Sequence, residues 1–374
     1  MKISILYGYM VTDENLSGGR TRLLHRRIER ELRSWIQEGQ LGKGARLPST
    51  RELCVKFGGV NHQTVRHALK TLIDEGLLES SQGRGVFVAS SIKKNFRVAL
   101  ILPNLEDEFT VQIAQGASTV LNEGGFHSVI MDAGRNAERE LANIRQLEDL
   151  PLDGAIIFPL PYSDMAEQIL RLKIDHFPFV LVDSYLPALQ TDVVTSDDYR
   201  EFYDLTKALL QKGYRRIAWL GIHQPLTIRD RLDGYRDALG DFDLPVKRNL
   251  IRYVDVEGAS PIAPFHENAE KVIRELVDGP ARPDAIMCAN DLIALFLLEQ
   301  MQRMGLRAPA DIAVTGFDGL HRGTTYSPTL TTVQRPIAEM GSMAARMLLE
   351  RIENKRTPFR RVVLRGEVVL RQSA

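Results

Sequence analysis

Two groups of polar side chains in this chain of 374 residues have types and spacings suited to binding chemistry. The first group lies between residues 61 and 70 beside an apolar stripe: His62, Gln63, Thr64, Arg66, His67 and Lys70. The second consists of carboxylates and amides that follow short apolar runs, such as Asp183, Asn290 and Asp318. The first group suits the base edges and phosphates of duplex DNA. The second suits a hydroxyl-rich ligand, because a carboxylate or amide can bond to several hydroxyls at once.

Two helices separated by a short turn are expected to position the first group. Ser49 can cap a helix over residues 50–57, with Glu52 at the capping-box spacing. After a glycine pair, Asn61 can cap a second helix that runs to about residue 75. The apolar side chains of this second helix share one face: Val65, Leu69, Leu72 and Ile73. The polar group is therefore expected on the opposite, solvent-facing side.

A hairpin and an earlier helix complete this unit. Residues 77–79 and 86–88 flank a glycine-rich stretch at 81–85, which is typical of two strands joined by a tight tip. Apolar residues at helical spacing over about 22–38 predict a first helix whose stripe belongs to the core of the unit. The order of elements is that of a winged helix-turn-helix, and the polar helix face suits a major groove.

This unit resembles the GntR family of bacterial transcription regulators. The residues that carry the resemblance are Leu47-Pro48-Ser49, Arg51-Glu52-Leu53, Thr64-Val65-Arg66, Ala68-Leu69, Leu72, Glu75-Gly76 and Gly83-Arg84-Gly85-Val86-Phe87-Val88. In that family the matching arginines and wing-tip residues touch DNA. With the polar helix face added, the expected DNA-binding set is Arg51, His62, Gln63, Thr64, Arg66, Gln82, Gly83 and Arg84. The chain has Asn61-His62 where the family usually has Ser-Arg or Thr-Arg, so the operator of relatives is not expected to transfer.

Beyond residue 95 the pattern changes to strands alternating with helices. The apolar runs that predict strands are 98–102, 128–131, 155–158, 179–182, 217–220, 251–254, 285–288 and 312–314. The helical patterns are 111–122, 137–147, 165–172, 202–210, 231–239, 267–276 and 292–304. Such alternation predicts an α/β unit of doubly wound parallel sheets, here in two lobes. Sheets of this kind bind ligands beyond the carboxyl ends of their strands, where the second polar group lies.

This second unit resembles the effector domain of the LacI/GalR family, which has the fold of periplasmic sugar-binding proteins. The matching segments are Val98-Ala99-Leu100-Ile101-Leu102-Pro103, Leu152-Asp153-Gly154-Ala155-Ile156-Ile157, Val182-Asp183, Ser196-Asp197-Asp198, Gly213-Tyr214-Arg215-Arg216-Ile217-Ala218, Arg231-Leu232-Asp233-Gly234-Tyr235, Pro283-Asp284-Ala285, Cys288-Ala289-Asn290-Asp291, Gly316-Phe317-Asp318 and Leu330-Thr331-Thr332-Val333. The resemblance implies that Arg231, Asn290 and Asp318 line an effector cleft. It also implies that Phe109 and Asp183 contribute from the other lobe.

Plain structural roles stand beside these site assignments. Asp318 and Asn290 can also cap the helices that follow their strands. Asp291 is expected to act as such a cap. Arg229 is a further effector candidate and equally a surface residue.

The pairing of the two modules resembles the arabinose-type repressors. The expected organisation is a tail over 1–20, the winged helix-turn-helix over 21–89, a linker over 90–95 and the two-lobed effector-binding domain over 96–374. The first lobe is expected over 96–192 and 331–355, and the second over 193–330 and 356–374. Hinge crossings are expected near 192–196, 319–332 and 355–359. The linker is too short and polar for the hinge helix that LacI relatives insert into the minor groove.

Charge and cysteine usage limit the functional class. Between Arg20 and Lys70 the chain has 12 Lys and Arg against 4 Asp and Glu, although the whole chain is neutral. A basic head on an acidic body is typical of a nucleic-acid binder with a second function, although a solvated basic face alone also explains the charge. The two cysteines, Cys54 and Cys288, lie far apart, which agrees with a reducing cytoplasm. No apolar run is long enough to span a membrane.

Neither catalysis nor a metal or cofactor is expected. The histidines lack zinc spacing, and Ser196-Asp197-Asp198 with His223 lacks a nucleophile elbow. The chain is therefore predicted to be a cytoplasmic, homodimeric transcription regulator, a repressor that binds double-stranded operator DNA under the control of a sugar or sugar-derivative effector. The alternative is a DNA-bound scaffold whose lobes bind a partner protein or co-regulator instead of a free sugar.

Overall fold

A computed structural model describes residues 24–25, 27–36, 39–74, 76–81, 84–89, 96–160, 164–222, 226–254, 267–280, 282–353 and 358–374. The chain divides into two compact units, residues 1–95 and 96–374. The predicted tail at 1–20 and linker at 90–95 lie outside the described residues. Within the described parts, no helix is long and apolar enough to cross a lipid bilayer.

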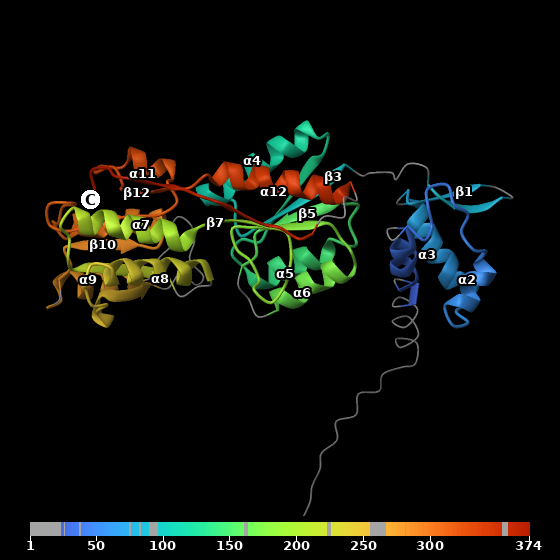
Figure 1. The fold of residues 1–374 in the computed structure, drawn as a ribbon, viewed down its shortest axis with the longest axis horizontal. Helices are drawn as coiled ribbons and strands as arrows, with labels where there is room; N and C mark the ends of the chain where they lie inside the picture. The colour runs from blue at the N-terminus through green and yellow to red at the C-terminus, as the bar shows by residue number, and fades with distance from the viewer. Residues whose placement is uncertain are drawn as a thin grey trace, which may run out of the picture. The chain divides into compact units, whose positions relative to one another are not determined.

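The first unit is a winged helix-turn-helix (Figure 1). Residues 24–25 and 27–36 are helical and precede α2 (Thr50–Lys56), α3 (His62–Asp74), β1 (Leu78–Ser81) and β2 (Gly85–Val88). β1 and β2 pair antiparallel, from Leu78 opposite Val88 to Ser81 opposite Gly85. The predicted order of helices and hairpin is confirmed.

The helix starts of this unit follow from local side-chain bonds. The Ser49 hydroxyl accepts from the Glu52 amide at 3.3 Å, and the Glu52 carboxylate accepts from the Ser49 amide at 2.7 Å. Asn61 Oδ1 accepts from the Gln63 amide at 2.9 Å. These bonds satisfy amides that the first helical turn leaves without partners. The apolar faces meet in a core that includes Ile28, Leu32, Leu53, Val65, Leu72, Leu78 and Val88.

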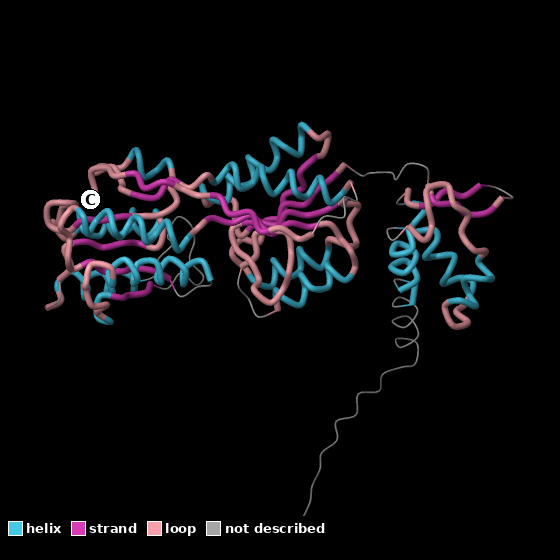
Figure 2. The backbone as a smooth tube through the Cα atoms, in the orientation of Figure 1, coloured by secondary structure: helices cyan, strands magenta, loops and turns pink. Residues whose placement is uncertain are grey.

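The second unit contains two parallel sheets, each with its own helices (Figure 2). The first sheet has the strand order β13-β7-β6-β5-β3-β4, and every neighbouring pair is parallel. Its strands are β3 (Arg97–Leu102), β4 (His127–Asp132), β5 (Gly154–Ile157), β6 (Phe179–Val182), β7 (Val193–Ser196) and β13 (Arg361–Leu364). Helices α4 (Glu108–Glu123) and α12 (Ile337–Ile352) cover one face, and α5 (Ala137–Gln146) and α6 (Met165–Ile174) cover the other (Figure 1). Because both faces are covered, β5 and β6 are buried at every position.

The second lobe is built on a four-stranded sheet in the order β11-β10-β8-β9, again parallel throughout. Its strands are β8 (Ile217–Ile222), β9 (Ile251–Val254), β10 (Ala285–Cys288) and β11 (Ala313–Thr315). Its helices are α7 (Asp198–Gln211), α8 (Leu226–Gly240), α9 (Glu267–Asp278), α10 (Asp291–Arg303) and the short α11 (His321–Thr325). A further pair, β12 (Thr332–Gln334) and β14 (Glu367–Val369), is antiparallel. Trp219, Phe202 and Phe317 lie in the core of this lobe.

The chain crosses between the lobes at three places that differ from the predicted lobe limits. β7 pairs in parallel with β6 and β13, so residues 193–196 and 361–364 belong to the first lobe rather than the second. β12 pairs with β14, so the second crossing follows Gln334 instead of Leu330. The predicted limits were wrong because these strands are three or four residues long and pair with partners distant in sequence. Helix α12, which packs on α4, was not predicted at all.

Candidate DNA-binding face and effector site

Helix α3 presents an exposed polar face opposite its buried apolar face. The exposed side chains on it are His62, Gln63, Arg66, His67 and Lys70. Arg51 in α2 and Arg84 beside the hairpin tip are exposed as well. Gln82 and Gly83, the other two predicted DNA contacts, lie outside the described residues. An exposed row of donors and cations on a helix is the arrangement that reads a major groove.

Thr64 departs from the prediction that placed it on the polar face, because its side chain is only 7% exposed. It stands one helical turn before Ala68, which is fully buried, and residues four apart lie on the same face of a helix. The structure therefore gives Thr64 a packing role. The base-reading candidates of α3 are its exposed neighbours.

The predicted effector residues Asp183 and Asp318 meet at one buried guanidinium. Arg335 Nη2 donates to Asp183 Oδ1 at 2.6 Å, and Arg335 Nη1 donates to Asp318 Oδ1 at 3.1 Å. Its Nε donates to Ser196 Oγ at 2.9 Å. Asp183 follows β6 of the first lobe, Asp318 follows β11 of the second, and Arg335 lies where the chain crosses from β12 to α12. One side chain thus bonds to both lobes.

Arg231 on α8 forms a second buried ion pair beside the first. Its Nε donates to Asp198 Oδ1 at 2.7 Å, and its Nη1 donates to the Ala289 carbonyl at 2.7 Å. The Arg231 guanidinium lies 4.0 Å from the ring centroid of Phe317, and that of Arg335 lies 5.4 Å from the same centroid. The aromatic ring therefore contributes cation–π attraction to both arginines.

The other effector candidates lie around this ionic cluster, which we define as Asp183, Asp198, Arg231, Asp318 and Arg335. The ring centroid of Phe109 lies 4.8 Å from the Arg335 guanidinium. Asn290 caps α10 through Oδ1, which accepts from the Ile293 amide at 2.9 Å, so its alternative role as a cap is confirmed. Arg229 has 76% of its side chain exposed and pairs with Asp233, which confirms its surface alternative.

Asp291 was predicted to cap α10, and this was wrong because Asn290 fills that position. The buried Asp291 carboxylate instead accepts from the Leu320 amide and from the Thr332 hydroxyl, each at 2.7 Å. It thereby ties α11 and β12 to the start of α10. A Cβ at Gly316 would lie 2.1 Å from Asp291 Oδ1, so this packing requires a glycine there.

Burial and charge shape the protonation of the ionic cluster. Burial raises the pKa of Asp318 to about 8, although Arg231 and Arg335 oppose the shift. Burial also raises the pKa of Asp198, against the same two arginines. Burial lowers the pKa of the Arg335 guanidinium, but the nearby carboxylates, Asp183 first, outweigh that effect and leave the pKa raised. With three carboxylates around two guanidiniums, the cluster favours added protons, cations and hydrogen-bond donors over anions.

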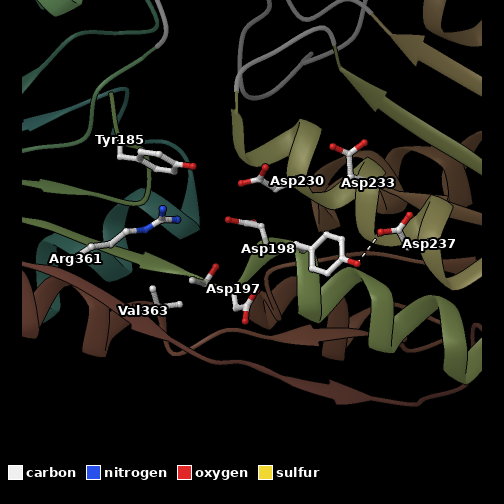
Figure 3. A pocket seen from close by; sticks show the side chains of 10 residues that line it. Tyr185, Asp197, Asp198, Asp230, Asp233, Asp237, Arg361 and Val363 are labelled. Carbon is white, nitrogen blue, oxygen red and sulfur yellow. Dashed lines mark hydrogen bonds between the residues drawn. The ribbon is translucent and has the colours of Figure 1, made fainter. Parts of the chain in front are cut away.

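A pocket of about 590 Å³ adjoins the ionic cluster (Figure 3). Its lining residues are Tyr185, Ser196, Asp197, Asp198, Tyr199, Asp230, Asp233, Asp237, Arg361 and Val363. Two pocket residues also belong to the hydrogen-bond network of the arginines: Ser196 accepts from Arg335, and Asp198 accepts from Arg231. Figure 3 shows Tyr185 and Arg361 across the pocket from Asp230, and the Arg361 guanidinium lies 4.0 Å from the tyrosine ring centroid. The volume is within the usual range of small-molecule sites.

The structure brings four of the five predicted effector residues together in a different way from the prediction. These four residues do not line the pocket, and each is less than one-tenth exposed: Phe109, Asp183, Arg231 and Asp318. They lie instead against the buried arginines and their carboxylate partners. Arg335, which completes the cluster, was not among the residues predicted from the sequence. Its signal was an arginine followed by proline one residue beyond the Leu330–Val333 segment, where a short strand ends. Among the described residues no group of three or more acidic, histidine or cysteine side chains could hold a metal ion.

Comparisons with known proteins match both units. A family described as "Bacterial regulatory proteins, gntR family" matches residues 24–88, and one described as "Periplasmic binding protein-like domain" matches residues 206–374. The "Arabinose metabolism transcriptional repressor" of Geobacillus stearothermophilus is 30% identical over 358 residues, which is 92% of this chain and 96% of that protein.

Solved structures agree with these matches. The "transcriptional regulator CelR-cellobiose complex" is 26% identical with a TM-score of 0.67, covering 85% of this chain and 92% of that one. The "transcription regulator GntR from Chromobacterium violaceum" is 28% identical with a TM-score of 0.65, covering 74% and 98%. Because the similarity to the Geobacillus repressor spans nearly all of both chains, the protein belongs to the family of transcriptional repressors that join a GntR-type winged helix-turn-helix to a periplasmic-binding-protein-like domain.

Proposed function

We propose that the protein is a cytoplasmic repressor whose affinity for its operator is controlled by a sugar or sugar derivative bound between the lobes. The observation that carries this proposal is the ionic cluster, in which side chains from both lobes converge beside a pocket large enough for a sugar. Two similarities support the ligand class, since one relative is named for arabinose metabolism and one related structure is a complex with cellobiose.

Control of DNA binding is proposed to act through a homodimer. Two copies place two heads on two half-sites, and movement of the lobes about the three crossings changes how the heads can be spaced. The chain acts in this scheme by binding alone, without catalysis. Thermodynamic reciprocity then requires that operator DNA change the effector affinity by the same factor.

A thermal-shift screen of the full chain tests the effector. L-Arabinose, D-ribose, cellobiose and the phosphates of the two monosaccharides are compared, because a true ligand raises the melting temperature by mass action. The stabilisation is about 2.7 kcal/mol at a ligand concentration of 100 times the dissociation constant. Asp318→Asn should lose the shift, and Asp204→Asn, on α7 and paired with the exposed Arg365, is the matched control.

A sugar that shifts the melting temperature must also change the affinity for DNA from the region upstream of the protein's own gene. That affinity should fall steeply with salt, because cationic side chains displace counterions from DNA. If no sugar stabilises the chain and a partner protein does, the scaffold function replaces the proposed one.

A further inference from the structure

We propose, resting on the function above, that Arg335 is a built-in occupant of the effector site. Its guanidinium fills the space between Asp183 and Asp318, so an effector must displace it to reach the two carboxylates. Only a ligand that donates hydrogen bonds or carries positive charge can take its place. The site therefore selects neutral polyols or amino sugars over sugar phosphates.

The contacts of Arg335 resemble those of a bound ligand more than those of a surface ion pair. Its side chain is 1% exposed, and its three guanidinium nitrogens each donate to a different side chain. The rings of Phe109 and Phe317 lie 4.8 Å and 5.4 Å from the guanidinium, so both lobes add an aromatic contact as well. A planar cation held by carboxylates and flanked by rings is how proteins bind small guanidinium groups.

The two carboxylates are held in place by backbone bonds that do not involve the Arg335 side chain; the Asp318 carbonyl accepts from the Arg335 backbone amide at 3.2 Å, a bond that truncation of the side chain keeps. Asp183 has φ 65° and Asp318 has φ 124°. Both values lie in the positive region of φ that residues other than glycine rarely adopt. Each such conformation costs about 1–3 kcal/mol and persists where the surroundings enforce it, most often at functional sites. The Asp183 amide donates to the Val194 carbonyl at 2.8 Å, which fixes the first of them within the sheet. Both strained residues thus aim a carboxylate at the same point.

The charge around this point decides which ligands can enter. The ionic cluster already holds three acidic side chains, and Glu201, whose Oε2 is buried without a hydrogen-bond partner in the described part of the chain, adds a fourth nearby acid. Displacing Arg335 removes positive charge from between Asp183 and Asp318. A phosphate would add negative charge at that moment, whereas hydroxyl or ammonium groups supply the donors that the carboxylates lose.

The test uses the full-length Arg335→Ala variant and methylguanidinium chloride in the millimolar range, with sodium chloride at matched ionic strength. The truncation leaves a guanidinium-sized space between the two carboxylates, so methylguanidinium should raise the melting temperature of this variant. At ten times its dissociation constant it should multiply the ratio of folded to unfolded protein by about eleven. Wild type should show no such gain because its site is filled. Arg365→Ala, which removes an exposed arginine paired with Asp204, is the matched control.

A double variant, Arg335→Ala with Asp318→Asn, should lose most of the gain because one of the two carboxylates is gone. An equal response in wild type, Arg335→Ala and Arg365→Ala would overturn the proposal, as would an undiminished response in the double variant. If Arg335→Ala is unfolded on its own, the measurement is the recovery of its helical circular dichroism when methylguanidinium is added. Absence of recovery at every methylguanidinium concentration that leaves wild type folded would overturn the proposal.

The ligand class has its own readout in the wild-type chain. A sugar phosphate that stabilises wild type more than its parent sugar would overturn the assignment. The methylguanidinium measurement needs neither DNA nor sugar, so its failure leaves the proposed repressor function standing. Conversely, if the chain failed to bind operator DNA, the inference about Arg335 would still stand, because its test does not involve DNA.

Discussion

Helix α3 and the ionic cluster between the lobes place the same side-chain types in opposite environments. On α3 the polar and cationic side chains are exposed to solvent. In the ionic cluster the arginines and aspartates are buried and are already paired with one another. A surface that binds a polyanion can leave its cations in water at little cost. A buried charge must have a partner inside the protein, because leaving it unpaired costs several kcal/mol of folding free energy.

This difference predicts that a substitution in the cluster affects folding more than one on the surface. Arg335→Ala should lower the free energy of unfolding by about 3–5 kcal/mol, because it strands two buried carboxylates. Arg365→Ala should cost no more than about 1 kcal/mol, because its pair with Asp204 is exposed. Urea unfolding can be followed by Trp219 in a Trp35→Phe background, since the chain has two tryptophans and Trp219 lies in the second-lobe core. Equal losses in the two arginine variants would contradict the comparison.

The opposite result is expected on α3. Arg66→Ala should weaken specific operator binding by about 1–3 kcal/mol if the side chain reads a base, and leave the unfolding midpoint unchanged because Arg66 is exposed. Titration of labelled operator DNA measures the first quantity and urea unfolding the second, with Arg365→Ala again as control. Unchanged DNA affinity would remove Arg66 from the recognition face. A large loss of stability would mean that α3 uses this residue for packing, as it uses Thr64.

The same contrast explains what the sequence could predict. The capping box of Ser49 and Glu52 and the alternation of strands with helices depend on neighbours in the chain, so spacing alone predicted them. Arg335 is 152 residues from Asp183 and 139 from Ser196, and no local pattern links them. The residues of the short strands β7, β12 and β13 were placed in the wrong lobe for the same reason. Thr64 was misplaced because a threonine fits either face of a helix, and only packing decides.

The local features give smaller, separable effects within the head. Ser49→Ala should destabilise α2 by about 1 kcal/mol, because it removes the hydroxyl that accepts from the Glu52 amide. Hydrogen exchange of α2 amides in the full chain should accelerate by a factor of about five, the equivalent of that energy. Exchange in the second lobe should not change. Equal acceleration in both units would show that the head does not unfold as an independent part.

The smallest effect expected is a pH dependence that separates buried acids from exposed ones. Glu140 on α5 is fully buried; its Oε1 accepts from the Leu160 amide at 3.0 Å, and its Oε2 has no hydrogen-bond partner among the described residues. Burial raises its pKa from 4.5 to about 7, so the folded state holds a proton that the unfolded state has lost. Its stabilising contribution is complete below about pH 4.5 and is lost as the pH rises through about 7.

Between about pH 6 and 8 this loss is on the order of 1 kcal/mol. Glu140→Gln, which cannot titrate, should therefore flatten the fall in melting temperature over that range. Glu52 in the head has the opposite sign, because its bond from the Ser49 amide lowers its pKa, so Glu52→Gln should leave the slope above pH 6 unchanged. Asp318, whose pKa is raised to about 8, adds a separate fall over the same range, which Glu140→Gln leaves in place and Asp318→Asn removes. An identical slope in wild type and Glu140→Gln would contradict the contribution of Glu140.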